Sequence, residues 1–567
     1  MHSRLSRSRR TIAFIASMIG MLAIQGRAFA QEALLSSTED YYDFLALNGS
    51  LERPYLTYRT LSDSDWDVSG LGAHPWAGNN LGTKRVVSDN FAFRIYGPEL
   101  FSSFNSAAPY GQNDGALWQG RGLNASLSAG ARAELTFGDS RVELTFKPVV
   151  YGSQNLPFEL VPPAYSDSES GGIYAGKASE YGYFGIKYID APQRFGDDPF
   201  GGFSWGDSEV RFSWKTLTAG FGTQSIWLGP AKINPIIMSN NAPPFPKADI
   251  GVRKTELTLP WLGWDLGYVE GRLVAGYLSE SEWFDNDDSN DHNLLSLLTL
   301  SYAPSILPEL TLFANRVYLS KFDSSGFPAL GSLFFVNLGG GGAQDAWDQR
   351  ASVGFDFLVP AGGIEVYGEA GINDYGPSLD GYIRYPFHTM VYSSGISKKF
   401  KVSVKHSIDW LFKFEWSNLE ASQDGQIIGL STFYSHYQIK QGYSNQGQWL
   451  GVNGTGGNYQ NFSFEILHRK GVLDISIKRA NPDVDYIYNK AKYSTDIPST
   501  DIWLLQKDLK SMLSFEVSSI YYITHQLQLH TLIGINSIHN PTYIGFDWGK
   551  DNKIDNFIIQ AGVKWMQ

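Results

Sequence analysis

The chain has 567 residues, a formal net charge of -12 and no cysteine. Without cysteine it cannot hold a disulfide framework, a thiolate zinc site or a thiol nucleophile, and its 57 acidic against 45 basic residues exclude nucleic acid as the main partner. The mean hydropathy of -0.21 excludes a bundle of transmembrane helices, although aromatic side chains make up 14% of the residues.

The N-terminus has the three-part pattern of a secretory signal peptide. Four arginines between positions 4 and 10 precede an apolar run from Thr11 to Ile24, and Ala28-Phe29-Ala30 forms a cleavage site with small first and third residues. The apolar run has 14 residues. At ~1.5 Å per residue this is too short to span a bilayer core of ~30 Å. We therefore predict that residues 1–30 are a signal peptide that is removed on export.

Residues 31–85 follow a different pattern from the rest of the chain. Thr38 can cap a short helix that continues to Leu47. Glu39 and Asp40 lie in its first turn, where carboxylates interact favourably with the helix dipole. Polar, turn-rich sequence follows the helix. We expect this stretch to be a partly helical segment on the periplasmic side, separate from the strands that follow.

Residues 86–567 are dominated by segments in which apolar and polar side chains alternate. Such alternation gives a β-strand one apolar and one polar face. One clear run is Ala131–Phe137, which the turn Gly138-Asp139-Ser140 joins to a second run, Val142–Phe146. Further alternating runs are Val210–Trp214, Phe412–Trp416, Leu473–Ile477 and Phe557–Trp565.

Strands of this kind fit either a soluble sandwich or propeller, or a closed barrel in lipid. The barrel is favoured because the strands recur without a linker and their apolar faces are rich in aromatic residues, as in membrane girdles. The last strand also reaches the C-terminus, with Trp565 third from the end. We predict an all-β, transmembrane antiparallel β-barrel of about 18 strands over residues 86–567, in the outer membrane.

No motif in the chain predicts catalysis, a cofactor or a metal. Gly202-Phe203-Ser204-Trp205-Gly206 matches the nucleophile elbow, but an alternating strand follows where that motif requires a helix. The histidines lack zinc-binding spacing, and the run Gly339–Gly342 lacks the lysine of a phosphate loop. The acidic run Asp285–Asp291 could offer oxygens to calcium, but it lacks the turn glycine and has Ser296 at the twelfth position. We expect a solvated loop tip there.

A stiff, polar segment rich in proline and asparagine, Trp227–Pro246 (WLGPAKINPIIMSNNAPPFP), resembles the hallmark of the Wzi-like capsule assembly family. Members of that family are outer-membrane lectins that hold capsular polysaccharide at the cell surface. Further segments resemble the family in the same order along the chain: Tyr41–Trp66, Pro109–Asn124 (PYGQNDGALWQGRGLN), Ile189–Gly196, Asp348–Pro360, Ile364–Asp374 and Tyr434–Gly451 (YSHYQIKQGYSNQGQWLG).

The resemblance implies an 18-stranded barrel with a small N-terminal helical bundle near the periplasmic mouth, extracellular loops that bind capsule glycan, and no catalysis. The sequence departs from the family pattern at Gly451–Gly457, where relatives tend to carry a Gly-Pro-Gly element. Loop conformation there and glycan specificity therefore do not transfer. Residues of the hallmark segment that could bind glycan or have a structural role are Trp227, Asn234, Asn240, Asn241 and Pro243.

Sugar binding requires aromatic faces for C–H groups and side-chain amides for hydroxyls. The candidate polysaccharide contacts are Trp283, Trp347, Tyr443, Gln448, Trp449 and Asn453. The aromatic candidates could equally belong to an interfacial girdle. The segment Asn234–Pro246 could equally pin a loop inside the lumen, and the sequence leaves both alternatives open.

The resemblance to the family implies a non-enzymatic outer-membrane lectin. We expect it to act as a monomer in contact with outer-membrane lipid and lipopolysaccharide, and to help attach or assemble a capsular or other surface polysaccharide. An outer-membrane porin or channel for small solutes or oligosaccharides is the alternative, because it would show the same alternation around an open lumen. A barrel enzyme acting on lipid would need a partner for Ser204, and the sequence assigns none.

Overall fold

The computed structural model describes most of the chain. The described residues are 37–60, 65–68, 70–72, 74–161, 181–182, 188–259, 261–285, 287, 291–322, 347–373, 379–403, 407–422, 432–454, 456–486, 509–543 and 552–566. The predicted signal peptide, residues 1–30, lies outside them. No helix in the described ranges has the length and apolar character needed to cross a membrane.

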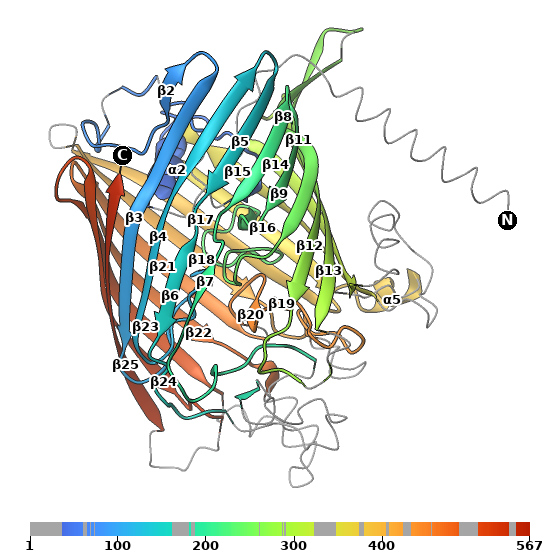
Figure 1. Ribbon diagram of the computed structural model, residues 1–567. Helices are drawn as coiled ribbons and strands as arrows, with labels where there is room; N and C mark the ends of the chain where they lie inside the picture. The colour runs from blue at the N-terminus through green and yellow to red at the C-terminus, as the bar shows by residue number, and fades with distance from the viewer. Residues whose placement is uncertain are drawn as a thin grey trace.

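The wall of the molecule is one closed antiparallel sheet (Figure 1). Its strands are β2 (Arg85–Ser88), β3 (Phe91–Asn105), β4 (Gly122–Phe137), β5 (Ser140–Phe146), β6 (Val149–Ser153), β7 (Phe200–Ser204), β8 (Glu209–Trp214), β9 (Leu217–Gly222), β11 (Lys247–Leu259), β12 (Trp264–Ser279), β13 (His292–Pro304), β14 (Leu310–Lys321), β15 (Trp347–Val359), β16 (Ile364–Asn373), β17 (Met390–Ser403), β18 (Ile408–Asn418), β21 (Asn458–His468), β22 (Gly471–Asn481), β23 (Ser511–Tyr522), β24 (Leu527–His539) and β25 (Lys553–Met566).

The sheet closes because β25, the last strand, pairs with β3, the first long one. β4 pairs with both β5 and β6, while β5 pairs with β8 and β6 with β7. We call one passage of the chain along the full wall a crossing. β5 and β6 together form one crossing, and β7 and β8 together form the next. Each is interrupted in its middle, where Lys147 and Gly206 form an isolated bridge. Counted in this way and without the short β2, the described residues form 18 crossings, which confirms the predicted barrel.

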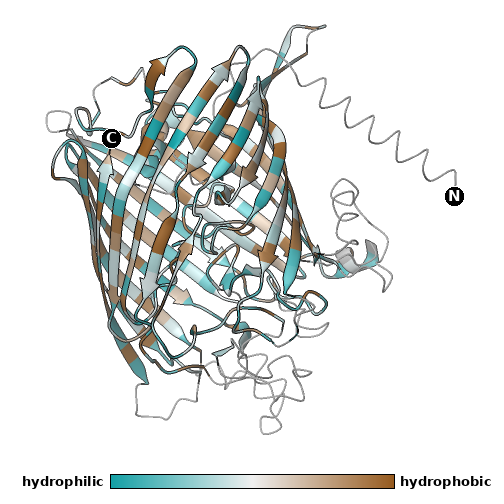
Figure 2. Cartoon of the chain, in the orientation of Figure 1, coloured by the Kyte–Doolittle hydropathy of each residue, from teal (hydrophilic) through white to brown (hydrophobic). Residues whose placement is uncertain are grey.

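Apolar side chains point outward and polar ones inward along the wall strands. On β22, Ile475 and Ile477 are exposed, whereas Ser476 between them is buried. Figure 2 shows the resulting alternation of hydrophobic and hydrophilic residues along the strands. A surface in lipid must be apolar and must leave no backbone group unpaired, and the closed sheet with outward-facing apolar residues meets both requirements.

The two ends of the barrel differ. The first long strand, β3, begins at one of them and the last strand, β25, finishes at the same one; we call it the helix end and the opposite one the loop end. The helix end carries α2 (Ser37–Leu47), the last residues of β25 and tight turns such as Gly138-Asp139 (Figure 1). The loop end carries the segments that follow β3, β6, β12 and β18. The remaining short elements are β1 (Tyr58–Thr60), β10 (Ile226–Leu228), β19 (Ser444–Asn445), β20 (Gln448–Trp449), the 3-10 turn Pro360–Gly362 and α5 (Leu379–Arg384).

The helix end is held together by aromatic packing and a cluster of ion pairs. α2 begins at Ser37, one residue before Thr38, so the predicted capping residue lies inside the helix. The ring of Tyr41 stacks on Trp76 with centroids 3.9 Å apart. Arg53 joins Asp43 of α2, at 2.7 Å, to wall carboxylates of β15 and β16 at 2.8 and 2.6 Å. Although burial alone would raise it, Arg53 and Lys232 hold the pKa of Asp43 below its ordinary value.

Candidate functional site

A plug fills one side of the lumen. We define the plug as residues 226–246, which include β10, together with β1 and residues 432–454. β1 pairs with β10, and β19 pairs with β20, so the plug has short sheets of its own. Ile236, Ile237 and Met238 form a core with side chains from the inner wall, and none of the three is more than 1% exposed. The wall side chains of this core are Val274, Leu278, Leu295, Leu297, Val317, Leu319 and Val391.

Carboxylates on the inner wall anchor the backbone of the plug. Glu415 of β18 accepts hydrogen bonds from the backbone N–H groups of Lys232 and Asn234, both at 2.7 Å. Glu270 of β12 accepts from Leu56 and Thr57, next to β1, at 2.8 and 2.9 Å. Hydrogen bonds to charged groups are stronger than neutral ones, and buried N–H groups need partners. These glutamates therefore satisfy plug backbone that forms few hydrogen bonds of its own.

An outer cavity of about 490 Å³ lies at the loop end, between residues 109–119 and 447–454. Aromatic rings of Tyr110, Trp118, Trp449 and Tyr459 line it. Side-chain amides also line it, and these are Gln112, Gln119, Gln193, Asn241, Gln448, Asn453, Asn461 and Gln560. Rings and amides are the groups that pack on sugar C–H faces and pair with sugar hydroxyls.

Two aspartates support the rim of the outer cavity: Asp190 is fully buried, and Asp114 is partly exposed. Burial raises the pKa of Asp114 to about 7, against hydrogen bonds from Gln119 and the backbone of Gln112. Burial also raises the pKa of Asp190 to about 6, although this carboxylate accepts hydrogen bonds from Ser281 and Gly447. Asp190 thereby ties three separate loops together, and it positions the turn that carries Gln448.

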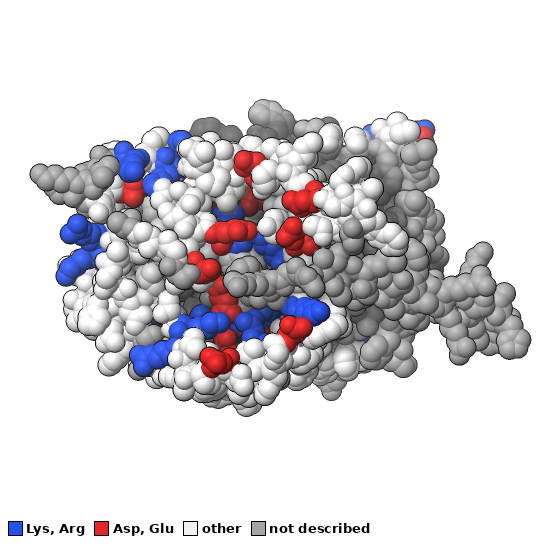
Figure 3. Space-filling model, turned by 90° about the horizontal axis from the view of Figure 1, so that it is seen from above, with Lys and Arg blue, Asp and Glu red and all other residues white. Residues whose placement is uncertain are grey.

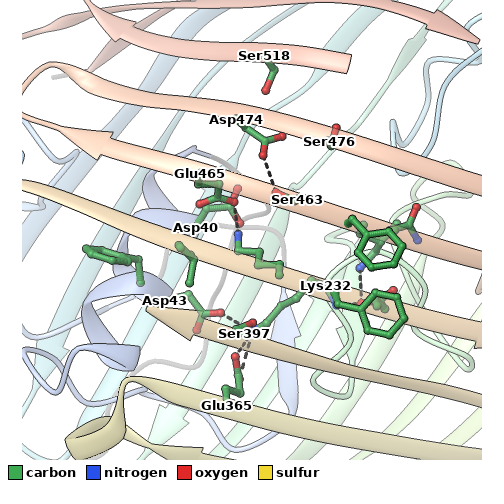
Figure 4. Close-up of a pocket in the computed structure, with 18 of the residues that line it drawn as sticks. Asp40, Asp43, Lys232, Glu365, Ser397, Ser463, Glu465, Asp474, Ser476 and Ser518 are labelled. Carbon is green, nitrogen blue, oxygen red and sulfur yellow. Dashed lines mark hydrogen bonds and ion pairs between the residues drawn. The ribbon is translucent and has the colours of Figure 1, made fainter. Parts of the chain in front are cut away.

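An inner cavity of about 290 Å³ lies toward the helix end, between α2, the plug residues Lys232 and Ile233, and the wall strands β16 to β24. Figure 4 shows Asp40 of α2 beside Glu465 and Asp474 of the wall. Lys413 pairs with Glu465, and Ser463 donates to Asp474 at 2.5 Å. Figure 3, which looks onto the helix end, shows acidic and basic side chains gathered in the middle of this face. The inner cavity therefore has a strongly charged lining, beside the aromatic rings of Phe44, Tyr367, Phe414 and Phe462.

Three of the six sequence-predicted polysaccharide contacts lie together at the outer cavity: Gln448, Trp449 and Asn453. Gln448 makes no side-chain hydrogen bond to any residue that the structure describes, so its amide is available to a ligand. Asn453 is exposed and donates to the carbonyl of Gly111 at 2.9 Å. Trp449 is 8% exposed, because most of its ring packs in the plug core.

The other three predicted contacts lie elsewhere. Tyr443 is fully buried in the plug, where it stacks on Tyr434 and lies under the guanidinium of Arg350. Trp347 starts β15 and packs edge-on against Tyr318 of the neighbouring strand, outside the outer cavity. Trp283 packs over Gly196, where an added Cβ would lie 2.6 Å from the indole. It lies in a loop after β12 and does not line the cavity.

The predicted residues of the hallmark segment connect the plug to the loops around the outer cavity. Asn234 accepts a hydrogen bond from Gln112 at 2.7 Å, and Asn240 donates to the carbonyl of Asn113 at 2.7 Å. Asn241 donates to the carbonyl of Trp449, and the carbonyl of Pro243 accepts from Asn445. Trp227 donates its indole N–H to Ala231 inside the plug and is 1% exposed. These contacts are made within the protein and position the cavity rim.

Several lining residues were not singled out from the sequence. Tyr110, Trp118 and Gln119 all lie within Pro109–Asn124, a segment that resembles the family but offered no reason to choose individual residues. Lys478 and Glu516 lie on wall strands and line both cavities. The available signal was alternation: Glu516 lies between Phe515 and Val517, and Lys478 follows the outward-facing Ile475 and Ile477, so both side chains are expected to face the lumen.

One group of carboxylates has the spacing of a metal site. Oxygens of Asp65, Glu134 and Glu143 lie within 4.8 Å of one another. Each carboxylate already has a cation beside it: Arg141 is 3.1 Å from Asp65, Lys84 is 3.1 Å from Glu134, and Arg253 is 3.0 Å from Glu143. Basic side chains therefore neutralise this donor set, and it forms an ion-pair network between wall and N-terminal segment.

The two remaining motifs lie at strand ends. Ser204 is the last residue of β7, and its hydroxyl accepts a hydrogen bond from the N–H of Gly206 at 3.1 Å. The next element is β8, so the helix of a nucleophile elbow does not follow it. In the acidic run Asp285–Asp291, Asn286 and residues 288–290 lie outside the described residues. The expectation of a solvated loop tip there therefore stays a prediction from the sequence.

A closed antiparallel barrel with 18 crossings, a plugged lumen and an amide-rich mouth defines the class as an outer-membrane β-barrel that is not a simple open pore. A family model described as "Capsule assembly protein Wzi" matches residues 111–530, well over half of the chain. The chain belongs to the Wzi capsule assembly family. No curated protein sequence matches it.

Two solved structures serve for comparison, and the first of them supports the fold. The structure of Wzi from Escherichia coli is described as an outer-membrane protein involved in group 1 capsule assembly and a carbohydrate-binding β-barrel. It is similar with a TM-score of 0.52 at 13% identity, over 84% of each chain. At this identity the likeness supports the shared fold alone. OprD from Pseudomonas aeruginosa matches with a TM-score of 0.39 at 6% identity, over 87% of this chain and 97% of its own.

Proposed function

We propose that this chain is an outer-membrane lectin that binds surface polysaccharide, such as a capsule, and holds it at the cell. The single observation that supports this function best is the lining of the outer cavity by aromatic rings and side-chain amides. Gln448, Trp449 and Asn453 are the contacts we assign first. The family membership supports capsule assembly as the process that this binding serves.

The mechanism is binding and not chemistry. Each hydrogen bond to a sugar hydroxyl contributes about 1 kcal/mol, so one sugar unit binds weakly. A polymer presents many repeats near the same surface, and several weak contacts raise its residence time. The hallmark residues Asn234, Asn240 and Asn241 act in this proposal as positioning residues for the rim. The apolar outer face lies among outer-membrane lipids, and a single chain forms the complete site.

Binding of the purified protein to a panel of bacterial surface polysaccharides tests this function. We expect one class of polysaccharide to bind, and Gln448→Ala and Asn453→Ala each to weaken binding about fivefold, which corresponds to about 1 kcal/mol. Gln460→Ala is the matched control, because Gln460 lies on β21 next to Asn461 but on its other face. Failure of every polysaccharide to bind, or equal binding by all variants, would contradict the proposal.

A deletion strain tests the same function in the cell. Loss of the gene should leave polymer synthesis intact but release polysaccharide into the medium. Complementation with the Gln448→Ala, Asn453→Ala double variant should restore the barrel in the membrane without restoring retention. Unchanged cell-bound polysaccharide in the deletion strain would count against a role in attachment.

A further inference from the structure

The outer cavity extends from the loops into the lumen along five neighbouring wall strands, β21 to β25. On β23 its lining includes Met512, Ser514 and Glu516, with Met512 nearest the loop end. These side chains lie on one face of the strand, and the four residue steps from the first to the last cover roughly 14 Å of wall. The volume of about 490 Å³ lies within the usual range of pockets that enclose a small ligand. The cavity can therefore enclose sugar units, and not only contact a polymer at its surface.

Side chains form a floor at the inner end of the outer cavity. The ammonium of Lys478 is 2.9 Å from the carboxylate of Glu516, and the hydroxyl of Tyr110 donates to the same carboxylate. Lys478 and Glu516 belong to the wall, whereas Tyr110 belongs to the loop after β3, so this contact crosses the space from wall to loop. Beyond it on β23, Ser518 lines the inner cavity and not the outer one. A glycan that enters from the loop end therefore meets this floor.

Two buried polar atoms of the outer cavity have no hydrogen-bond partner among the described residues. They are the amide nitrogen of Asn461 and the amide oxygen of Gln119, and the two residues are 8% and 4% exposed. Asn461 is paired with Lys478 in the strand register, so it lies at the level of the floor. A buried donor or acceptor without a partner is costly, and a sugar hydroxyl can satisfy either kind because it both donates and accepts. The two atoms therefore indicate a hydroxylated ligand that reaches the floor.

We propose that the outer cavity receives the terminal sugar unit of a polysaccharide, so that the protein recognises a chain end and not the interior of the polymer. This inference rests on the lectin function proposed above and specifies its ligand. An interior unit is linked on both sides, so a chain of rigid rings would have to enter and leave through the same mouth of a cavity that has a floor.

A terminal unit is linked on one side only, and it carries a free hydroxyl where the next linkage would be. Asn461 and Gln119 pair with the hydroxyls of this unit at the floor. Tyr459 lies two residues nearer the loop end on the same face of β21, and its ring packs against the unit behind. The outer cavity therefore binds the end of the chain by hydrogen bonds and the following unit by ring contact.

The number of protein molecules bound to one polysaccharide chain tests this inference. The polysaccharide that binds the purified protein is separated by size into short and long chains, which carry the same ends. At saturation we expect the same number of protein molecules per chain in both fractions, measured by light scattering of the complexes. A number that rises in proportion to chain length would show interior binding and overturn the inference, while the lectin function would stand. Absence of binding to any polysaccharide would contradict the lectin function and this inference with it.

A linear polysaccharide has two ends, and both present a terminal unit with a free hydroxyl. Borohydride reduction opens the sugar ring at the reducing end alone. Binding that is lost after reduction assigns the reducing end to the cavity, and binding that persists assigns the opposite end. Either result supports the inference when the number of protein molecules per chain is independent of chain length.

Two variants of β21 test how deep the terminal unit lies. Asn461→Ala removes the donor at the floor and should weaken binding about fivefold, with the number of protein molecules per chain unchanged. Ser463→Ala is the matched control, because Ser463 lies two residues further along the same face and lines only the inner cavity. It should bind like the wild type. If Asn461→Ala also binds like the wild type, or if Ser463→Ala weakens binding as strongly, the glycan does not end at the floor and the inference is wrong.

Discussion

Strands β12 to β15 and strands β21 to β24 belong to the same closed sheet, but their inner faces meet different surroundings. The first group packs against the plug, with Val274, Leu295 and Val317 fully buried. The second group lines the two cavities with polar and charged side chains. The lumen of this barrel is therefore neither open nor filled, because the plug occupies one side and leaves the other to solvent and ligand.

The same residue type does different work on the two sides. On the plugged side, Glu270 accepts hydrogen bonds from plug backbone and stands in for a missing strand neighbour. On the hydrated side, Glu465 pairs with Lys413 beside solvent. Buried donors depend on their acceptor, whereas solvated ion pairs can exchange a partner for water. Substitutions on the plugged side should therefore lower the free energy of unfolding more than substitutions on the hydrated side. The hydrated side should tolerate changes of side chains that contact a ligand.

Removing one glutamate from each side of the lumen tests this difference most directly. Glu270→Ala leaves the N–H groups of Leu56 and Thr57 buried without an acceptor. At about 1–3 kcal/mol for each unsatisfied donor, the free energy of unfolding should fall by about 2–6 kcal/mol. Denaturant unfolding of the purified barrel, followed by tryptophan fluorescence, measures the change.

Glu465→Ala is the control for Glu270→Ala. Glu465 and its partner Lys413 have side chains that are 17% and 26% exposed, and they line the inner cavity. Lys413 keeps Asp40 and Asp474 as neighbouring carboxylates, so loss of Glu465 should cost about 1 kcal/mol or less. Equal destabilisation by the two variants would mean that the two sides of the lumen contribute alike, contrary to the structure.

The next largest effect concerns the two faces of one strand on the hydrated side. Ile475 is 37% exposed on the outer face of β22, and the adjacent Ser476 lines the inner cavity. Ile475→Arg should lower the free energy of unfolding by about 2–4 kcal/mol if Ile475 lies at mid-depth in lipid. Ser476→Arg places the same charge among carboxylates and should cost clearly less. The measurement is folding stability in lipid vesicles, and a larger loss for Ser476→Arg would show that the faces are reversed.

The barrel was predictable because each strand carries its own signal. Alternation placed Phe412, Phe414 and Trp416 on one face and Lys413 and Glu415 on the other. In the structure Lys413 and Glu415 line the inner cavity and Phe412 and Trp416 do not, although Phe414 also contributes to the lining. Successive side chains of a strand point to opposite faces of the sheet, so a few neighbouring residues are enough to predict which side chains face outward. The strand number followed from chain length, since about ten residues form each crossing.

The plug and the cavities were less accessible to sequence reasoning. Alternation shows that Glu415 faces the lumen, but not that it accepts hydrogen bonds from residues 232–234, about 180 positions earlier in the chain. The hallmark segment offered two alternatives, glycan binding or pinning a loop in the lumen. Its contacts to Asn113, Trp449 and Asn445 favour the second, and they depend on the register of loops that no local pattern encodes.

Aromatic residues were the least informative of the candidates. Trp449 lines the outer cavity, Tyr443 lies within the plug core, and Trp347 contacts Tyr318 at the wall. All three occur in polar sequence near a strand end, so composition does not separate them. The amide side chain of Gln448 was a better guide, because an amide in a tight turn next to a buried aromatic has few partners within the protein.

The smallest predicted effect is a pH dependence on the hydrated side, at Asp114. Burial raises the pKa of this carboxyl to about 7, above its ordinary value near 4. Between these two values the folded state holds the proton and the unfolded state has released it. Stability therefore falls as the pH rises from about 4 to about 7 and stays lower above that. We expect the barrel to be less stable at pH 8 than at pH 5, with Asp114 contributing on the order of 1 kcal/mol.

Asp114→Asn should remove this contribution, because an amide does not ionise and can keep the hydrogen bond to Gln119. Asp139→Asn, at an exposed turn of the helix end, is the control and should retain the wild-type pH dependence. Denaturant midpoints at pH 5 and pH 8 for the three proteins measure the effect. If Asp114→Asn keeps the full difference between the two pH values, the cavity rim is already solvated at Asp114. The boundary between the plugged and hydrated sides would then lie deeper in the barrel than the structure places it.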